Sequence, residues 1–299
     1  MKRLLAFLFA IMMLFACAIS VSADNSATVS VDTESQLYKK RVLFVGDSIC
    51  EASNDGRVGW AGRIIKWNSM RGVNAGKSAA SISTARGANR VIAQLKAHEK
   101  NGPLYDFVIM HGGVNDAWDS APVGVMTEGF DAEYDVTTFA GGLEETIRFA
   151  KETFTNAKFG YIINFRQPLA TAYGRLSDMS EYVEMTKQIC DKWGVVYLDL
   201  YNDENLNNNL LKTNTRQFVP DAVHPNTAGY EIISPIINEW MKTIPDEEIP
   251  EESSEDVPVE SEIVEDEKRK GGADWIIYTV CGVVVVAAIA VLAINLKKK

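Results

Sequence analysis

A serine near the start of this chain stands where a buried strand would end and a loop begin. Ser48 lies in the sequence Gly46-Asp47-Ser48-Ile49, directly after the apolar run at 42–45. An open α/β sheet places its chemistry at such strand ends. Gly-Asp-Ser is also an ordinary turn sequence. The interpretation of Ser48 as a nucleophile therefore depends on which other residues accompany it.

A base for this serine can be sought among only three histidines. His98 ends a polar helical pattern, which is typical of a surface residue, and His111 has no carboxylate at convenient local spacing. His224 is followed by Pro225, which disfavours a helix at 224 and favours a loop. His224 is therefore the candidate base, while His111 could border the site.

A carboxylate stands three residues before the candidate base, in Asp221-Ala222-Val223-His224. Asp221 could accept the Nδ1 proton of His224 and leave Nε2 facing the serine. It could equally cap the helix that begins near Asn226, although Asn226 is the nearer and better cap candidate. A Ser-His-Asp set of this kind is the machinery of serine hydrolases.

Hydrolysis through a serine also needs donors for the developing oxyanion. Gly76, in Asn74-Ala75-Gly76, would let the backbone approach a substrate with its amide free to donate. Asn115 follows an apolar run and offers a neutral side-chain amide. Each has an ordinary alternative, a turn glycine and a turn or helix start. The combination of these residues, more than any one of them, indicates a serine hydrolase.

The elements that position these residues alternate along the chain. β-Branched and apolar runs predict strands at 42–45, around 73, at 107–110, 159–163 and 195–198. Helical spacing predicts helices at 60–70, 88–98, 139–153, 180–193 and 227–241. Such alternation predicts a three-layer α/β/α sandwich with a mostly parallel central sheet. Residues 116–138 have no clean period, and a long loop there is typical of a functional loop.

The N-terminus predicts a secretory signal peptide over residues 1–23. Lys2-Arg3 precedes an uncharged apolar run from 4 to 21, and small residues follow. Two alternatives stay open. One is an uncleaved anchor, because the run is close to spanning length, and the other is lipoprotein processing at Cys17.

The C-terminus predicts a transmembrane helix with a lysine tail over residues 273–299. Residues 275–296 are almost wholly apolar and end at three lysines. A helix of about 20 such residues crosses a bilayer. The lysines predict the cytoplasmic side and Trp275 the outer interface. A buried core helix is the alternative, disfavoured by valines and alanines on every face. We therefore expect a single-pass protein of the cell membrane, with its folded part outside the cell, as on a bacterial surface.

Between the folded part, 24–243, and this helix the composition changes to an acidic stalk, 244–272. Twelve acidic residues and no basic or aromatic one occur between 244 and 267. Such a segment repels itself and stays extended.

The sequence contains no concentrated basic patch, so it does not predict a nucleic-acid partner. Cys50 and Cys190 are expected to be unpaired thiols, and neither lies in a metal-binding Cys-x-x-Cys pair.

Over about residues 41–243 the chain resembles the SGNH hydrolases, a subgroup of the GDSL esterase and lipase family. The resemblance is carried by four blocks in the family's order: Gly46-Asp47-Ser48, Asn74-Ala75-Gly76, Gly113-Val114-Asn115-Asp116 and Asp221-Ala222-Val223-His224. Ile49 replaces the leucine of the family name, and Ala79 follows Ser78 where glycine is common.

This resemblance implies a flavodoxin-like sheet, Ser48 as nucleophile, and a shallow, open site without a cofactor. It also implies an oxyanion hole made of the Ser48 amide, the Gly76 amide and the Asn115 side chain. The family's substrates range from acetylated sugars to lipids and thioesters, so the substrate stays open at this point.

The predicted location outside the cell favours an ester on carbohydrate as the substrate. The protein would then be a short-acyl esterase. We assign Asp47, Trp60 and Trp118 to substrate binding. The two tryptophans and Tyr134 could stack on sugar rings, although each also fits a core or rim position. The alternatives are a lysophospholipase or thioesterase acting on lipid, and a surface binding module that keeps the fold without turnover.

Overall fold

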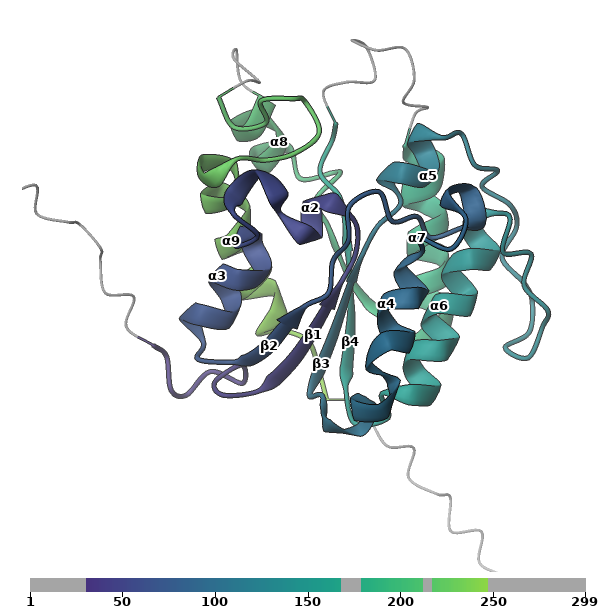
Figure 1. Ribbon diagram of the computed structural model, residues 1–299, viewed down its shortest axis with the longest axis horizontal. Helices are drawn as coiled ribbons and strands as arrows, with labels where there is room; N and C mark the ends of the chain where they lie inside the picture. Colours follow the sequence, from purple (N-terminus) through teal and green to yellow (C-terminus); the bar gives the residue numbers. More distant parts are fainter. Residues whose placement is uncertain (1–30, 168–178, 212–216, 247–299) are drawn as a thin grey trace, which may run out of the picture. The chain divides into compact units, whose positions relative to one another are not determined.

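The computed structural model describes residues 31–167, 179–211 and 217–246 (Figure 1). The predicted signal peptide, the transmembrane segment and nearly all of the stalk lie outside these residues. Within the described ranges, no helix combines the length and apolarity that a membrane crossing requires.

A five-stranded parallel sheet forms the centre of the domain, with its strands in the order β2-β1-β3-β4-β5. The strands are β1 (Arg41–Val45), β2 (Arg71–Asn74), β3 (Phe107–His111), β4 (Lys158–Ile163) and β5 (Val196–Asp199). β1 and β3 are buried along almost their whole length, as expected of strands covered on both faces. The predicted α/β sandwich with a flavodoxin-like sheet is confirmed.

Two layers of helices cover the sheet (Figure 1). One layer holds α3 (Gly59–Trp67) and α9 (Thr227–Met241). The other holds α4 (Val91–His98), α6 (Phe139–Thr153) and α7 (Ser180–Trp193). The shorter helices are α2 (Ser48–Glu51), α5 (Val114–Trp118) and α8 (Glu204–Leu211), with 3-10 turns at Ser53–Asp55, Thr84–Arg86 and Glu99–Leu104. Both α2 and α5 begin at the carboxyl ends of strands, where the candidate residues are.

One predicted helix ends earlier than its apolar spacing indicates. α3 stops at Trp67 instead of continuing to Met70. Ser69 adopts a left-handed conformation with φ of 50°, and Met70 N donates to Ile65 O at 2.9 Å, which closes the helix end. Asn68 Nδ2 adds a second bond, of 2.9 Å, to Ile64 O, which already accepts from Asn68 N. The left-handed turn at Ser69 therefore outweighs the continuing apolar pattern.

The long segment between α5 and α6 is irregular, as predicted, and a buried ion pair anchors it. Lys192 Nζ lies 2.6 Å from Glu144 Oε1, and the Glu144 side chain is fully buried. The same ammonium donates to the carbonyl oxygens of Thr127 and Gly129 at 2.7 and 2.8 Å. One cation thus ties the loop to helices α6 and α7.

At the N-terminal ends of the strands, the first residue of β4, Lys158, contacts the last described residue of the chain. Lys158 Nζ lies 2.7 Å from Asp246 Oδ1 and 2.6 Å from Gln36 Oε1. Ile244, which the sequence analysis places in the stalk, is only 3% exposed. Folded packing therefore extends one residue or more past 243.

Candidate active site

The short helix α2 presents Ser48 directly above the end of β1. Asp47 Oδ1 accepts from Ile49 N at 2.9 Å and caps this helix. A Cβ at Gly46 would lie 2.9 Å from His111 O and 2.8 Å from Cys50 Cβ. Only glycine allows the strand to turn this tightly into the helix.

Ser48, His224 and Asp221 form a continuous chain of contacts. His224 Nε2 lies 2.7 Å from Ser48 Oγ, and His224 Nδ1 lies 2.7 Å from Asp221 Oδ2. With Nδ1–H donating to the carboxylate, Nε2 is left to accept the serine proton. This arrangement can generate a serine nucleophile.

The Asp221 carboxylate is held ionised by its own loop. Burial opposes its ionisation, but hydrogen bonds from the His224 backbone and ring and from Val223 N outweigh burial and lower the pKa of Asp221. Its Oδ1 accepts from His224 N at 2.7 Å. Asn226, as the sequence indicates, is the cap of α9, accepting from Gly229 N at 3.0 Å. Asp221 is therefore free for the histidine.

The structure contradicts the assignment of Gly76 to the oxyanion hole. Gly76 is buried, and its amide donates to Asn74 Oδ1 at 3.0 Å. A Cβ there would lie 2.7 Å from Glu51 N. Glycine is required at this position because the loop passes close to α2 at that point. The Gly76 amide is thus already engaged by Asn74.

Three residues further on, Ala79 reaches the position that Gly76 was expected to fill. Ala79 lines the same cavity as Ser48. Its φ of 62° lies in the left-handed region, which glycine adopts more readily. Its amide has no hydrogen-bond partner among the described residues. The amide is therefore available to a ligand.

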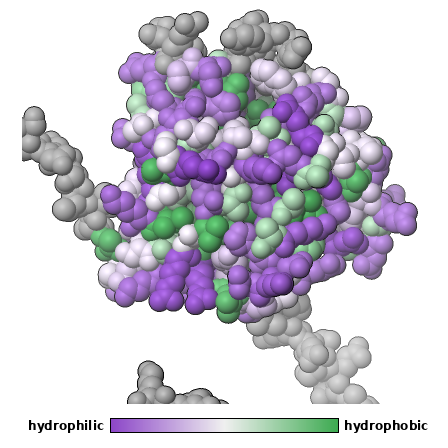
Figure 2. Space-filling model, in the orientation of Figure 1, coloured by the Kyte–Doolittle hydropathy of each residue, from purple (hydrophilic) through white to green (hydrophobic). Residues whose placement is uncertain are grey.

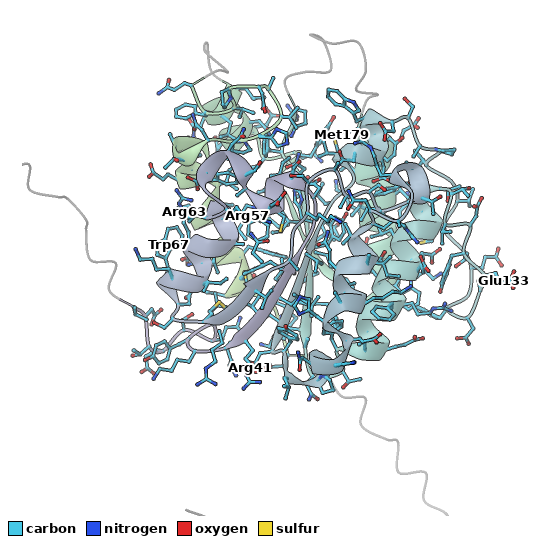
Figure 3. The ribbon with its side chains drawn as sticks, in the orientation of Figure 1. Arg41, Arg57, Arg63, Trp67, Glu133 and Met179 are labelled. Carbon is cyan, nitrogen blue, oxygen red and sulfur yellow. The ribbon has the colours of Figure 1, made fainter. Side chains whose placement is uncertain are left out.

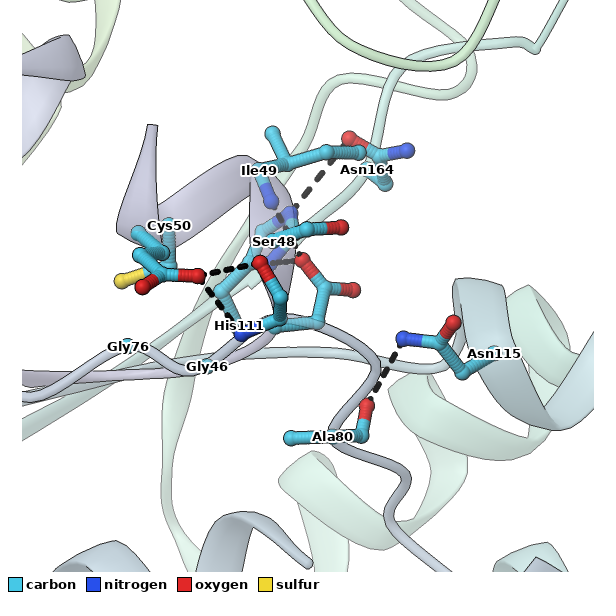
Figure 4. A network of polar contacts seen from close by, with 12 residues as sticks. Gly46, Ser48, Ile49, Cys50, Gly76, Ala80, His111, Asn115 and Asn164 are labelled. Carbon is cyan, nitrogen blue, oxygen red and sulfur yellow. Dashed lines mark hydrogen bonds and ion pairs between the residues drawn. The ribbon is translucent and has the colours of Figure 1, made fainter. Parts of the chain in front are cut away.

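Asn115 lies across the cavity from this loop. Its Nδ2 donates to Ala80 O at 2.8 Å (Figure 4). A side-chain amide nitrogen carries two hydrogens, so this bond leaves one for a ligand. The same bond holds the loop that carries Ala79.

A cavity of about 430 Å³ opens beside Ser48. Its lining is mixed polar and apolar and consists of Ser48, Ser53, Asn54, Ser78, Ala79, Arg86, Val114, Asn115, Trp118, Asp221, Val223 and His224. Trp118, one of the predicted substrate-binding residues, is half-buried in this wall.

The assignments of the other two substrate-binding residues, Asp47 and Trp60, are wrong, and Tyr134 does not line the cavity. Asp47 is fully buried and serves as the cap of α2. Trp60 is 1% exposed and packs edge-on against Phe44, with ring centroids 5.1 Å apart. Tyr134 lies outside the cavity wall, where the Arg148 guanidinium stacks on its ring. Apolar spacing on α3 directs Trp60 inward, toward the sheet.

Glu51 fixes the loop that carries Ala79. It accepts from Ser78 N at 2.7 Å, from Ser78 Oγ, and from Arg57 at 2.5 Å. Burial opposes its ionisation, but these bonds outweigh burial and lower the pKa of Glu51. Arg57 precedes α3, and Arg63 lies on it (Figure 3). Arg63 forms a second ion pair, with Asp55.

The pairing of His111 with Asp47 was not predicted from the sequence. His111 is 1% exposed, and its Nδ1 lies 3.3 Å from Asp47 Oδ1. Burial lowers the pKa of His111, but the Asp47 charge outweighs burial and raises it. Burial likewise opposes ionisation of Asp47, yet the charge of His111 lowers its pKa overall. The two residues are 64 positions apart, so only the pairing of β1 with β3 joins them.

Arg86 lines the cavity and was not predicted from the sequence. Its Nη2 lies 2.9 Å from Asp119 Oδ1, and its Nε contacts the other carboxylate oxygen. The pair places polar atoms of both signs at the cavity rim.

Cys50 and Cys190 are buried, unpaired thiols, as expected. Within the described ranges, no group of three His, Cys, Asp or Glu side chains could hold a metal ion.

Comparison with known proteins adds a family and a fold. The model of the GDSL-like lipase/acylhydrolase family matches residues 44–232. A search of curated proteins found no sequence match.

Solved structures share the architecture at low sequence identity. A protein from Lactobacillus plantarum is 22% identical, with a TM-score of 0.57, covering 68% of this chain and 97% of its own. A putative GDSL-like lipase from Bacteroides ovatus is 19% identical, with a TM-score of 0.50, covering 68% of this chain and 98% of its own. Both are similar to this chain in fold.

Proposed function

The chain belongs to the GDSL-like lipase/acylhydrolase family and is a carboxylic ester hydrolase, and from this premise we propose that Ser48, His224 and Asp221 are its catalytic triad. The proposal rests above all on the 2.7 Å contact between His224 Nε2 and Ser48 Oγ. A histidine so placed, with Asp221 on its other nitrogen, is the arrangement that activates serine in hydrolases.

In the first half of the reaction, His224 Nε2 takes the Ser48 proton as Oγ attacks the acyl carbon. The tetrahedral intermediate collapses when the carbon–oxygen bond to the alcohol breaks, and His224 gives its proton to that alcohol. Water, deprotonated by His224, then attacks the acyl carbon. The bond from that carbon to Ser48 Oγ breaks, His224 returns the proton to Oγ, and the acid is released. Asp221 stabilises the imidazolium in both halves.

The oxyanion accepts hydrogen bonds from the Ser48 amide, the Ala79 amide and Asn115 Nδ2. Ala79 replaces Gly76 in this role because its amide borders the cavity and has no partner among the described residues. Preorganised donors of this kind contribute a large part of the rate enhancement of acyl-transfer enzymes.

The substrate we propose is a short acyl ester, acetyl above all, carried on carbohydrate. The cavity of about 430 Å³ has a wall of mixed polar and apolar character, in which Asn54 and Arg86 offer donors and Trp118 an aromatic surface. Sugars bind through such hydrogen bonds and through ring stacking. Long acyl chains would instead need an extended apolar groove.

A lipid esterase is the second candidate, and chain-length preference separates the two. On the face shown in Figure 2, apolar residues are scattered among hydrophilic ones. We expect activity on p-nitrophenyl esters to fall steeply between acetate and octanoate. A preference for octanoate would favour the lipid substrate.

We further propose that the enzyme acts outside the cell, held by the predicted C-terminal helix. The uncharged apolar segment at 275–296 and the lysines after it support this. Protease added to intact cells should remove the catalytic domain, and its full protection would exclude an external site.

The decisive experiment measures p-nitrophenyl acetate hydrolysis by the purified full chain. Ser48→Ala and His224→Ala should each lower kcat by about 10⁴- to 10⁶-fold, as in other triads. Ser53→Ala, in the same cavity wall, and His98→Ala serve as matched controls with little effect. Equal rates in wild type and Ser48→Ala would leave the fold as a binding module without turnover.

A further inference from the structure

Four polar side chains are buried beneath the site, and none of them takes part in the proposed ester hydrolysis. Asp47, His111, Asn164 and Gln167 are 0%, 1%, 2% and 7% exposed. They lie at the carboxyl ends of β1, β3 and β4. Burying a polar group is costly unless it is paired. Four in one place therefore need an explanation.

The first links join Asp47 to Asn164 through His111. His111 Nδ1 lies 3.3 Å from Asp47 Oδ1, and His111 Nε2 lies 3.3 Å from Asn164 Oδ1 (Figure 4). His111 Nδ1 makes no hydrogen bond within the described ranges, so its contact with Asp47 is an ion pair. A carboxylate beside one ring nitrogen and an amide oxygen at the other suit an imidazolium. Asp47 Oδ2 has no hydrogen-bond partner in the described part of the chain. The imidazolium therefore supplies the charge that compensates it.

The remaining links run through Gln167 to the loop of the base. We assign the Gln167 amide with its nitrogen toward two carbonyl oxygens, because this orientation satisfies both its oxygen and its nitrogen. Its Oε1 then accepts from Asn164 Nδ2 at 2.6 Å. Its Nε2 donates to Ala222 O at 3.0 Å and Val223 O at 3.2 Å.

Each end of this chain of contacts adjoins one half of the proposed triad. Asp47 precedes Ser48 and caps the helix that the serine begins. Ala222 and Val223 stand between Asp221 and His224, and Ala222 holds a left-handed φ of 62°. The serine and the histidine are 176 positions apart in the chain. The four side chains thus join their two loops from below.

We propose that Asp47, His111, Asn164 and Gln167 are positioning residues that set the distance and angle between Ser48 and His224. This inference rests on the proposed function, because it concerns the geometry of that triad. A misplacement of about 1 Å can cost a reaction about 100-fold. The four side chains fix the two loops more tightly than the Ser48–His224 contact alone.

Asn164→Leu tests this with Asn68→Leu as its matched control. Both replace a buried asparagine, 2% and 3% exposed, by an apolar residue of similar size. Asn68 pairs with Asn238 at 2.7 Å, between α3 and α9. We expect both variants to lose thermal stability. Only Asn164→Leu should lower kcat for p-nitrophenyl acetate, by about 10- to 100-fold, with KM within about threefold of wild type.

Gln167→Met removes the next link, and the double variant tests whether the links act together. Residues of one network show strongly non-additive effects. Asn164→Leu with Gln167→Met should therefore lose little more kcat than the more damaged single variant. If Asn164→Leu does not fold, the kcat of Gln167→Met is compared with that of Asn68→Leu instead. Equal loss of kcat in Asn68→Leu, or unchanged kcat in both link variants, would overturn the inference.

A readout without substrate separates this inference from the proposed function. The Nδ1 proton of His224 should give a downfield proton NMR resonance, identified by its absence in His224→Ala. Asn164→Leu should broaden or shift it, whereas Asn68→Leu should not. An inactive wild type in which Asn164→Leu still perturbs this resonance would refute the esterase and keep the positioning role. An active wild type whose resonance is the same in both variants would refute the positioning role alone.

Discussion

Ala79 combines an exposed amide with a backbone conformation that suits glycine. Its φ of 62° costs an L-residue roughly 1–2 kcal/mol. Replacing alanine by glycine also adds about 0.4–1 kcal/mol of unfolded-state entropy. The strain therefore exceeds the entropic benefit of alanine by a small margin.

For Ala79→Gly, we expect the free energy of unfolding to rise by about 0.5–1 kcal/mol. Activity should be kept, because the amide stays in place. Urea unfolding and p-nitrophenyl acetate kinetics measure the two effects. Ala80→Gly is the control, since Ala80 is fully buried and not among the positive-φ residues. That variant should be destabilised, and stabilisation of both would show that backbone strain is not the cause.

Asn115 is the one donor of the proposed oxyanion hole that a side-chain substitution can remove. Asn115→Ala should lower kcat by about 10²- to 10³-fold with little change in KM. Asn89→Ala is the matched control, because Asn89 Nδ2 donates to Ser78 O at 3.0 Å and so anchors the same loop. A similar loss in both variants would mean that Asn115 acts only by holding the loop.

At the residue scale, the sequence could be interpreted where chemistry depends on residue type. Histidine is a scarce type in this chain, Asp221 stands three residues before His224, and the structure joins Ser48, His224 and Asp221 by direct contacts. The choice between Gly76 and Ala79 could not be made in this way. Backbone amides are the same in every residue, so only the path of the loop decides which one faces the cavity.

At the scale of elements, the buried Glu144–Lys192 pair is the main constraint on the irregular segment before α6. Lys192→Met would leave a fully buried carboxylate without its cation and should destabilise the fold by about 3 kcal/mol. Lys242→Met is the control, because its partner Glu239 is 69% exposed, and should cost less than about 1 kcal/mol. Chemical denaturation compares them, and similar small losses would show that water already screens Glu144.

The strands and most helices could be predicted because their apolar periods are long and regular. α6, α7 and α9 begin and end where the spacing indicates. The sequence did not predict α8, Glu204–Leu211, because ENLNNNLL contains four asparagines, which are poor helix formers. Its burial of Leu206 and Leu210 stabilises it. Such tertiary packing is invisible in the local sequence.

For the whole molecule, the Asp47–His111 ion pair links stability to pH. The pKa of His111 is raised, so its contribution is complete below about pH 6.5 and is lost as pH rises through the folded value. The pKa of Asp47 is lowered, so its contribution is complete above about pH 3.9 and is lost as pH falls. Both are fully present only between these limits.

The stability advantage of wild type over His111→Gln should therefore be largest near pH 5–6 and decline toward pH 9. Urea unfolding across this range measures it. Thr186→Val, which removes a buried hydroxyl that does not titrate, should show a constant difference. An advantage that grows toward pH 9 would mean that His111 is buried neutral.

The contact between Lys158 and Asp246 has a consequence for how this enzyme can be mounted. Lys158 begins β4, whereas Ser48 and Asn115 follow the carboxyl ends of their strands. The described chain thus ends at the edge of the sheet opposite the mouth of the cavity. An electrode, bead or sensor chip coupled just after residue 246 would hold the domain on the side opposite the cavity. The cavity would then face the solvent, and the immobilised enzyme could cleave esters on the surface of a polymer too large to enter any pore.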